Sequence, residues 1–233
     1  MLSKKSFLAS VYRYNPFTDR KPYYVKYEIE AGGKMKVLDV LRYIQRNFDG
    51  ELAFRSSCGI GRCGSCAVVV NGKPVLSCKE YIENIDIVIE PLANYPVIKD
   101  LIIDREPYNN KLKHIRPFLE NTARGTKQVA QEDYQQYKYF TCCVECLCCM
   151  SVCPSFSRVP LEFYGPCIFV QLARYKSHPL DGGARILMVK YGGLHNCISC
   201  KRCTAVCPQG IDIYNDVVVP FRTAILREGG DSF

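Results

Sequence analysis

Alternating apolar and polar positions predict β-strands in the first hundred residues. Phe7–Tyr14 and Tyr23–Glu30 alternate or are rich in β-forming residues, and Asn84–Glu90 alternates throughout. Ala67–Leu76 contains Asn71-Gly72 between two apolar runs, which indicates a hairpin with a type I′ turn. The pattern therefore predicts a mainly β-structured first part of the chain.

One helix is predicted among these strands. Apolar residues recur at helical spacing from Val37 to Phe48, and Asp49-Gly50 ends the predicted helix. Several strands with a single helix packed across them predict a β-grasp-like sheet. We expect this N-terminal domain to cover residues 1–105.

The pattern changes near residue 105. Val97–Asp104 and Leu112–Glu120 are predicted as helices, and the polar stretch Glu120–Tyr137 follows them. Further short helical segments are interrupted by Pro154, Pro160, Pro166, Pro179 and Pro208. We expect an α-helical ferredoxin domain over residues 106–233, which makes the fold class α+β.

Composition adds one unusual feature, 15 cysteines among 233 residues. Hydrophobic residues make up 48% and charged residues 23%, which excludes a disordered or collagen-like chain. The net charge of +8 is spread evenly, so no basic block favours nucleic acid. The longest stretch without Asp, Glu, Lys or Arg, Cys146–Ser157, is too short for a transmembrane helix.

The first cysteine group has the C-x4-C-x2-C…C spacing of plant-type [2Fe–2S] clusters. Its members are Cys58, Cys63, Cys66 and Cys78. Glycines inside this segment let backbone N–H groups approach the sulfurs closely. The segment also matches the dinucleotide pattern G-x-G-x-x-G, but that pattern must open a helix, and a predicted strand follows here. We therefore reject the nucleotide interpretation.

The second and third groups repeat the motif C-x2-C-x2-C-x3-C-P over Cys143–Pro154 and Cys197–Pro208. Three thiolates of each run bind one cubane, and the fourth begins a helix and binds the other cluster. One [4Fe–4S] cluster is assigned to Cys143, Cys146, Cys149 and Cys207. The second [4Fe–4S] cluster is assigned to Cys153, Cys197, Cys200 and Cys203. We expect these clusters to serve as the core of a domain with few large aliphatic side chains.

Zinc is the alternative metal, in a pair of knuckles that bind nucleic acid. Zinc sites usually pair two C-x2-C units a dozen or more residues apart, and neither run does so. Cys142, Cys148 and Cys167 are left over and are interpreted as buried small residues, although Cys142 competes with Cys143 as a ligand. His195, close to Cys197, is the one histidine worth testing for proton transfer.

The order of these motifs resembles that of the iron–sulfur subunits of succinate dehydrogenase and fumarate reductase. The resemblance covers nearly the whole chain and is carried by Ser57–Cys66, Pro91–Asp104, Cys153-Pro-Ser-Phe, Gly165-Pro166 and Cys207-Pro-Gln-Gly. It implies an enzyme subunit that relays electrons between an FAD-bearing subunit and an acceptor, in the tricarboxylic acid cycle or anaerobic respiration. Succinate and fumarate would be interconverted at the partner's FAD, so no catalytic residue is expected in this chain.

The chain departs from most members of this family at Cys200. Most members have C-x5-C-x3-C-P in this run and hold a [3Fe–4S] cluster there, whereas Cys200 supplies the fourth corner. We therefore expect one [2Fe–2S] and two [4Fe–4S] clusters, with one [4Fe–4S] plus one [3Fe–4S] as the alternative.

The region that usually binds quinone also departs from the family. The chain has no tryptophan, and Ile198 replaces a frequent histidine. The chain thus resembles non-classical members whose acceptor subunit is cysteine-rich and heterodisulfide-reductase-like. A membrane anchor is the other candidate acceptor subunit.

Two other functions stay open. A flavin dehydrogenase of glycolate or glycerol-phosphate type would use an equivalent subunit, and the zinc module is the remote alternative. The N-terminus has no secretory pattern, so we expect the thiols in a reducing cytoplasm. The chain would reach the inner face of the membrane only through its partners.

Overall fold

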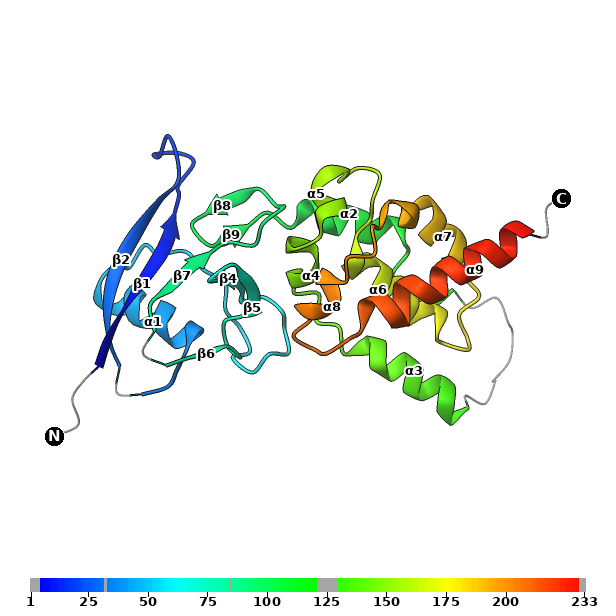
Figure 1. The fold of residues 1–233 in the computed structure, drawn as a ribbon, viewed down its shortest axis with the longest axis horizontal. Coiled ribbons are helices and arrows are strands. Elements are labelled where there is room, and N and C mark those ends of the chain that lie inside the picture. Colours follow the sequence, from blue (N-terminus) through cyan, green and yellow to red (C-terminus); the bar gives the residue numbers. More distant parts are fainter. Residues whose placement is uncertain (1–4, 32, 84, 121–129, 231–233) are drawn as a thin grey trace. The chain divides into compact units, whose positions relative to one another are not determined.

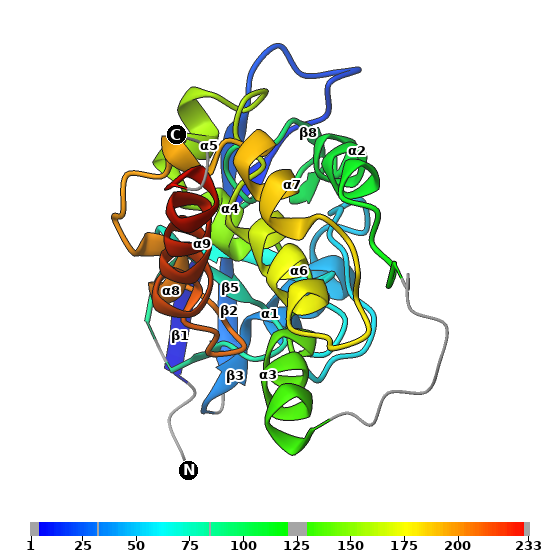
Figure 2. The ribbon, with the colours of Figure 1, turned by 90° about the vertical axis from the view of Figure 1, so that its right-hand side faces the viewer.

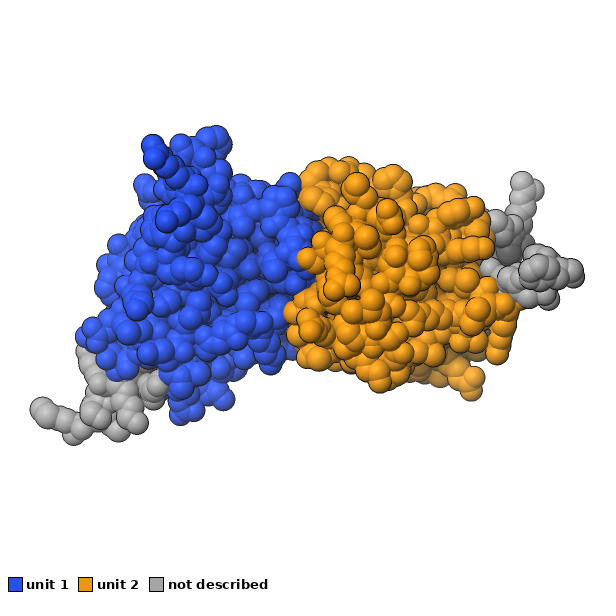
Figure 3. All heavy atoms as spheres, turned by 45° about the horizontal axis from the view of Figure 1, so that its top comes forward, with its two compact units in different colours: residues 1–105, 145–151 blue, residues 106–144, 152–233 orange. Residues whose placement is uncertain are grey.

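The computed structural model describes residues 5–31, 33–83, 85–120 and 130–230 (Figure 1). The chain forms two compact units (Figure 3). The first comprises residues 1–105 together with Glu145–Ser151, and the second comprises residues 106–144 and 152–233. The segment Glu145–Ser151 therefore belongs to the first unit although its neighbours in sequence belong to the second. A domain boundary at residue 105 implies that each unit folds independently, and this stays a prediction.

A five-stranded sheet forms the frame of the first unit, in the order β2-β1-β7-β4-β5. Its strands are β1 (Lys5–Arg13), β2 (Tyr23–Ala31), β4 (Ala67–Val70), β5 (Lys73–Leu76) and β7 (Ile87–Glu90). β1 is antiparallel to β2 and parallel to β7. Two small ladders join β3 (Met35–Lys36) to β6 (Tyr81–Ile82) and β8 (Val97–Lys99) to β9 (Ile102–Ile103).

The strands predicted from alternation are confirmed, including the hairpin of β4 and β5. Asn71 and Gly72 have φ angles of 48° and 77°, and positive φ at both central positions is the requirement of a type I′ turn. The predicted strand over residues 84–90 begins at Ile87, and Asn84 lies outside the described residues.

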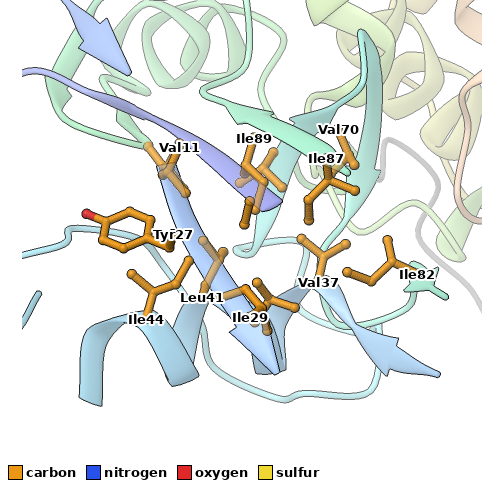
Figure 4. Close-up of a cluster of buried hydrophobic side chains, with 14 of the residues drawn as sticks. Val11, Tyr27, Ile29, Val37, Leu41, Ile44, Val70, Ile82, Ile87 and Ile89 are labelled. Atoms are coloured by element: carbon orange, nitrogen blue, oxygen red, sulfur yellow. The ribbon is translucent and has the colours of Figure 1, made fainter. Parts of the chain in front are cut away.

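Helix α1 (Val37–Asn47) covers one face of the sheet and closes the core of this unit (Figure 4). Its apolar side chains Val37, Leu41 and Ile44 are fully or almost fully buried with Ile29 and Ile89 of the sheet. Each such side chain contributes about 1.5–3 kcal/mol by leaving water. The single stripe of apolar residues on this helix therefore fixes it to the sheet, as the spacing predicted.

Residues Val97–Asp104 form the hairpin of β8 and β9, so the helix predicted there is wrong. Asp100, with a left-handed φ of 48°, turns the chain between the two strands. Its buried carboxylate accepts backbone hydrogen bonds from Tyr14 (3.0 Å) and Ala53 (2.9 Å), and a third from Arg13 Nε (3.0 Å). These partners are remote in sequence, so local spacing did not reveal them.

The second unit is helical, and together with the sheet unit it confirms the α+β class. Its helices are α2 (Glu106–His114), α3 (Gln131–Thr141), α5 (Pro154–Arg158), α6 (Pro166–Lys176), α7 (Arg185–Tyr191), α8 (Arg202–Ala205) and α9 (Val219–Gly230). A 3-10 turn η1 (Leu194–Asn196) precedes the third cysteine run, and a π-helical segment η2 (Tyr214–Val218) leads into α9. The short helix α4 (Cys148–Ser151) belongs to the first unit.

Helix α6 forms a hydrophobic core in the second unit that the spacing of residues did not predict. Most of its side chains are buried, and it packs against α3, α7 and η2 (Figure 2). Phe163 packs edge-on against Phe169 of this helix, with ring centroids 5.4 Å apart. The expectation that this domain has few large aliphatic side chains in its core is therefore wrong, whereas the part of the clusters in the core stays a prediction.

The helix predicted over Leu112–Glu120 is wrong beyond residue 114, where α2 ends. The fully buried Arg185 of α7 donates hydrogen bonds of 2.7–3.1 Å to the carbonyl oxygens of Ile115, Arg116 and Phe118. In a continuing helix, backbone N–H groups would occupy those carbonyls. A guanidinium from another helix therefore replaces the helical hydrogen bonds here.

Among the described residues, no helix is both long enough and apolar enough to cross a membrane.

Candidate iron–sulfur centres

The first cysteine group lies on a glycine-containing loop between α1 and β4. Gly59, Gly61 and Gly64 have φ angles of 68°, 78° and 69°, a left-handed conformation that glycine adopts at little cost. This path turns backbone N–H groups toward the thiols. Those of Gly61 and Arg62 lie 3.2 Å from the sulfurs of Cys78 and Cys58. Because β4 follows the loop, the nucleotide-binding pattern lacks the helix that it requires.

Each thiol of this group interacts with at least one other, Cys63 with Cys58 and Cys78 with both Cys66 and Cys58. The Ser65 hydroxyl, 3.1 Å from Cys63, lowers the pKa of that exposed thiol to about 6, and Cys58 contributes to the effect. Burial raises the pKa of Cys78 to about 11, with further contributions from Cys66 and Cys58. The loop thus presents one thiol ready to bind as thiolate, and iron would displace the protons of the others.

The hydrogen bonds of this loop fit a [2Fe–2S] cluster. Backbone N–H donors aimed at cysteine sulfurs are the interactions that stabilise an anionic cluster and set its potential. The thiolates that hold the cluster would be Cys58, Cys63, Cys66 and Cys78, as the spacing predicts. Ser65 is a residue that sequence reasoning missed, although its place between two cysteines was a signal.

Gly61 offers a direct test of this loop. A Cβ at Gly61 would overlap the aliphatic stem of Lys79, whereas a Cβ at Gly59 would meet nothing within 4 Å. Both substitutions force alanine into a left-handed φ, at about 1–2 kcal/mol. We expect Gly61→Ala to lower [2Fe–2S] occupancy severalfold, because Lys79 follows Cys78 directly and the Gly61 N–H bond is displaced.

The matched control for this prediction is Gly59→Ala, which carries the same backbone strain without the overlap. Iron content and the visible spectrum of the purified variants measure the difference. Equal occupancy in the two variants would show that the contact with Lys79 has no role.

The second and third cysteine runs have left-handed residues at the same two positions. Glu145 and Leu147 have φ angles of 50° and 68°, and Ser199 and Lys201, at the equivalent positions, have 60° and 58°. Left-handed φ values are uncommon for residues other than glycine, so their recurrence at both positions is informative. Residues of left-handed φ among right-handed ones form concave backbone nests that bind anions. Each run is therefore shaped to surround an anionic group.

The thiols of Cys153, Cys197, Cys200 and Cys203 are brought together in the second unit. Burial raises the pKa of Cys203 to about 12, and negative charge on the other three adds to that effect. Burial also raises the pKa of Cys153, with further contributions from Cys197 and Cys200. This is the set assigned to the second cubane, and Cys200 is its exposed member.

Arg222 of α9 holds the third run in place, and no sequence pattern indicated this role. Its guanidinium donates to the Ser199 hydroxyl at 2.7 Å and to the carbonyl oxygen of Cys197.

The fourth cysteines of the two runs differ in the backbone structure that follows them. Pro154 begins α5 immediately after Cys153, whereas Cys207-Pro208 lies in a turn. Among the described residues no helix begins directly after Cys207, so the helix expected there is wrong.

The ligands assigned to the first cubane differ in their burial. Cys146 and Cys149 are buried, and Cys143 and Cys207 are half-buried. Among the described residues, no three His, Cys, Asp or Glu side chains are placed to hold a single metal ion. Thiolates of a cluster bind different irons and need no such convergence.

The unassigned cysteines have separate surroundings. Cys148 and Cys167 are buried, as predicted, and Cys167 lies 3.7 Å from the Tyr108 hydroxyl. Cys142 is exposed, so its predicted burial is wrong, and its thiol donates to the Lys138 carbonyl at 3.5 Å. His195 is exposed on η1.

Comparison with family models defines the class of protein. A model described as "2Fe-2S iron-sulfur cluster binding domain" matches residues 8–110, and one described as "4Fe-4S dicluster domain" matches residues 139–211. The chain is thus an iron–sulfur protein with both kinds of cluster-binding domain.

Curated relatives then identify the family. The chain is 32% identical to the "Fumarate reductase iron-sulfur subunit" of Escherichia coli O6:H1, over 91% of this chain and 90% of that protein. It is 38% identical to a subunit of "Fumarate reductase (CoM/CoB)" from Methanothermobacter marburgensis over 94% of this chain, but spans only 44% of that protein. The chain belongs to the family of fumarate reductase and succinate dehydrogenase iron–sulfur subunits.

A solved structure supports the same assignment. A chain of the Mycobacterium smegmatis Sdh1 complex in the apo form superposes with a TM-score of 0.90 and 28% identity. The match covers 99% of this chain and 100% of that chain. The chain therefore shares its fold with a chain of that complex.

Proposed function

We propose that this chain relays electrons between an FAD-bearing succinate dehydrogenase or fumarate reductase subunit and a second acceptor. Iron–sulfur clusters supply one-electron redox chemistry when bound. The chain's own residues hold the clusters, direct backbone N–H groups toward their sulfurs and surround them with buried side chains. In this proposal the interconversion of succinate and fumarate belongs to the partner's flavin. Family membership and the order of the three cysteine groups support this function over a zinc module.

The proposed cluster set is one [2Fe–2S] and two [4Fe–4S] clusters, held by the twelve cysteines assigned above. The matching left-handed residues in the two runs are the observation that carries this proposal. Cys200 occupies in the third run the position that Cys146 occupies in the second, within the same backbone shape. The electrostatic proximity of Cys200 to Cys153 and Cys203 adds support for a fourth thiolate at the second cubane.

The acceptor proposed is a thiol/disulfide couple on a cysteine-rich subunit. The chain lacks tryptophan, and Ile198 is exposed within the third run, directly after Cys197, where many family members have histidine. The name of the Methanothermobacter relative refers to CoM/CoB and not to a quinone. A membrane-anchor subunit with a quinone is the competing acceptor. Location at the inner face of the membrane through partners is part of this proposal.

Anaerobic purification of the chain with its partners tests the function. We expect about ten irons per chain, against about nine with a [3Fe–4S] cluster. EPR spectra should show succinate reducing the clusters or fumarate oxidising them. Zinc in place of iron would contradict the proposal. Reduction by glycolate or glycerol phosphate, with no response to succinate or fumarate, would instead identify another flavin dehydrogenase.

The acceptor is tested separately with the same complex. We expect thiols to reduce the clusters in the presence of the acceptor subunit. Reduction by a quinol analogue that a quinone-site inhibitor blocks would identify a quinone acceptor instead.

A further inference from the structure

A small cavity in the first unit lies between the [2Fe–2S] loop and the second cysteine run. Its volume of about 20 Å³ is close to the space of one water molecule. Gly64 and Ser65 line it from the loop, and Cys146 lines it from the second run. Arg55 and Arg105 line it as well. Two arginines therefore border the space between a [2Fe–2S] segment and a cubane ligand.

Arg105 is fixed to the backbone beside this cubane ligand. Its Nη2 donates to the carbonyl oxygen of Glu145 at 2.9 Å, and Cys146 is the next residue. The far end of the same segment is held by Asn94, whose amide donates to the carbonyl oxygens of Met150 and Ser151, both at 3.0 Å. The segment that carries Cys146 is thus held at both ends by residues of 91–105.

The charge of Arg105 acts on a buried sulfur. Cys146 is 8% exposed, so water screens its interactions weakly. The Arg105 guanidinium and Cys146 line the same small cavity, and Arg105 donates to the carbonyl oxygen of the residue directly before Cys146. A reduced cubane carries one more negative charge than an oxidised one. A fixed positive charge nearby therefore stabilises the reduced cubane more than the oxidised one.

We propose that Arg105, with a smaller contribution from Arg55, raises the reduction potential of the first [4Fe–4S] cluster. The inference rests on the proposed function, because it requires a cubane at Cys146. Both are positioning residues that act through the electric field beside Cys146. Their charges would stabilise the reduced form of this cubane and so change the equilibrium of electron transfer with the neighbouring [2Fe–2S] centre.

Redox titration of the purified complex, followed by EPR, tests the inference. Arg105→Gln keeps a donor for the Glu145 carbonyl but removes the charge, and we expect it to disfavour reduction of this cubane about tenfold. For one electron, a tenfold change corresponds to about 59 mV. Arg105→Lys keeps the charge and should restore most of the potential. Arg55→Gln, at an exposed position, should shift the potential in the same direction by less.

Arg42→Gln is the matched control, because it removes an equal charge from an exposed position of helix α1. We expect it to leave the potential of the cubane unchanged. If both Arg105→Gln and Arg55→Gln have the wild-type potential, the inference is wrong but the proposed function still stands. If Arg105→Gln loses its cubane, the potential of the cubane in Arg55→Gln decides. Absence of a cubane signal from the wild-type complex would overturn the proposed cluster set, and the inference with it.

Discussion

Replacing Cys200 with alanine is expected to convert the second cubane into a [3Fe–4S] cluster. Cys200 is the exposed member of its ligand set, so the corner iron that it binds would be left facing solvent without a protein thiolate. Cys153, Cys197 and Cys203 would continue to hold the other three irons. We expect the iron content to fall by about one per chain and the oxidised protein to acquire a [3Fe–4S] EPR signal.

The matched control is Cys142→Ala, which removes an exposed thiol outside the assigned ligand sets. It should leave the iron content and EPR spectra unchanged. A Cys200→Ala variant with unaltered clusters would mean that Cys200 is not a ligand. An oxidised-state [3Fe–4S] signal from the intact wild-type protein would contradict the same assignment without any substitution.

Replacing Arg185 with methionine is expected to produce the largest loss of stability in the second unit. Arg185 forms ion pairs with Asp181 (2.8 Å) and Glu120 (3.3 Å), and its own side chain is fully buried. Removal of one partner from a buried ion pair costs about 3–5 kcal/mol, because the other charge stays buried without compensation. The carbonyl oxygens of Ile115 and Phe118 would lose the Arg185 donor as well. Urea unfolding of the cluster-loaded protein measures this loss.

Arg116→Met is the matched control for Arg185→Met. Arg116 also pairs with Glu120, at 3.0 Å, but its side chain is 53% exposed. An exposed ion pair contributes about 0–1 kcal/mol, so this variant should remain close to wild type. Equal losses in the two variants would refute a special role for the buried guanidinium.

The loss of unfolding free energy in the Arg185→Met variant should also depend on pH. Burial acts to raise the pKa of Asp181, but hydrogen bonds from Arg185 and the backbone outweigh it and hold the pKa below its ordinary value. A lowered folded-state pKa gives stability that is present above the unfolded pKa of about 3.9 and is lost at lower pH. The difference in unfolding free energy between wild type and variant should therefore become smaller as the pH falls below about 4. A constant difference from pH 7 to pH 3 would argue against this ion pair as its source.

The local pattern was sufficient where an element makes its contacts through one periodic face. Helix α1 carries a single apolar stripe against the sheet, and Asn71-Gly72 has the residues that a type I′ turn requires. The pattern failed where the chain satisfies its polar groups over a long range. Asp100 binds backbone groups from residues 14 and 53, and Arg185 binds the carbonyls after α2. In the first case a side chain of the segment binds remote backbone groups, and in the second a remote side chain replaces the hydrogen bonds of a local helix.

The cysteine spacing by itself determined the kinds of cluster to expect, because cluster ligands must recur at short, characteristic intervals. The order of the cysteine groups, together with the segment Pro91–Asp104, indicated the family. Only the tertiary structure placed Arg222, Asn94 and Arg105 beside the cysteine runs. It also grouped Glu145–Ser151 with the sheet unit, although the sequence on either side belongs to the helical one. The physical reason is the same in each case. Hydrogen bonds and charges that orient a cysteine come largely from residues distant in the chain, whereas the thiolates themselves are close neighbours in sequence.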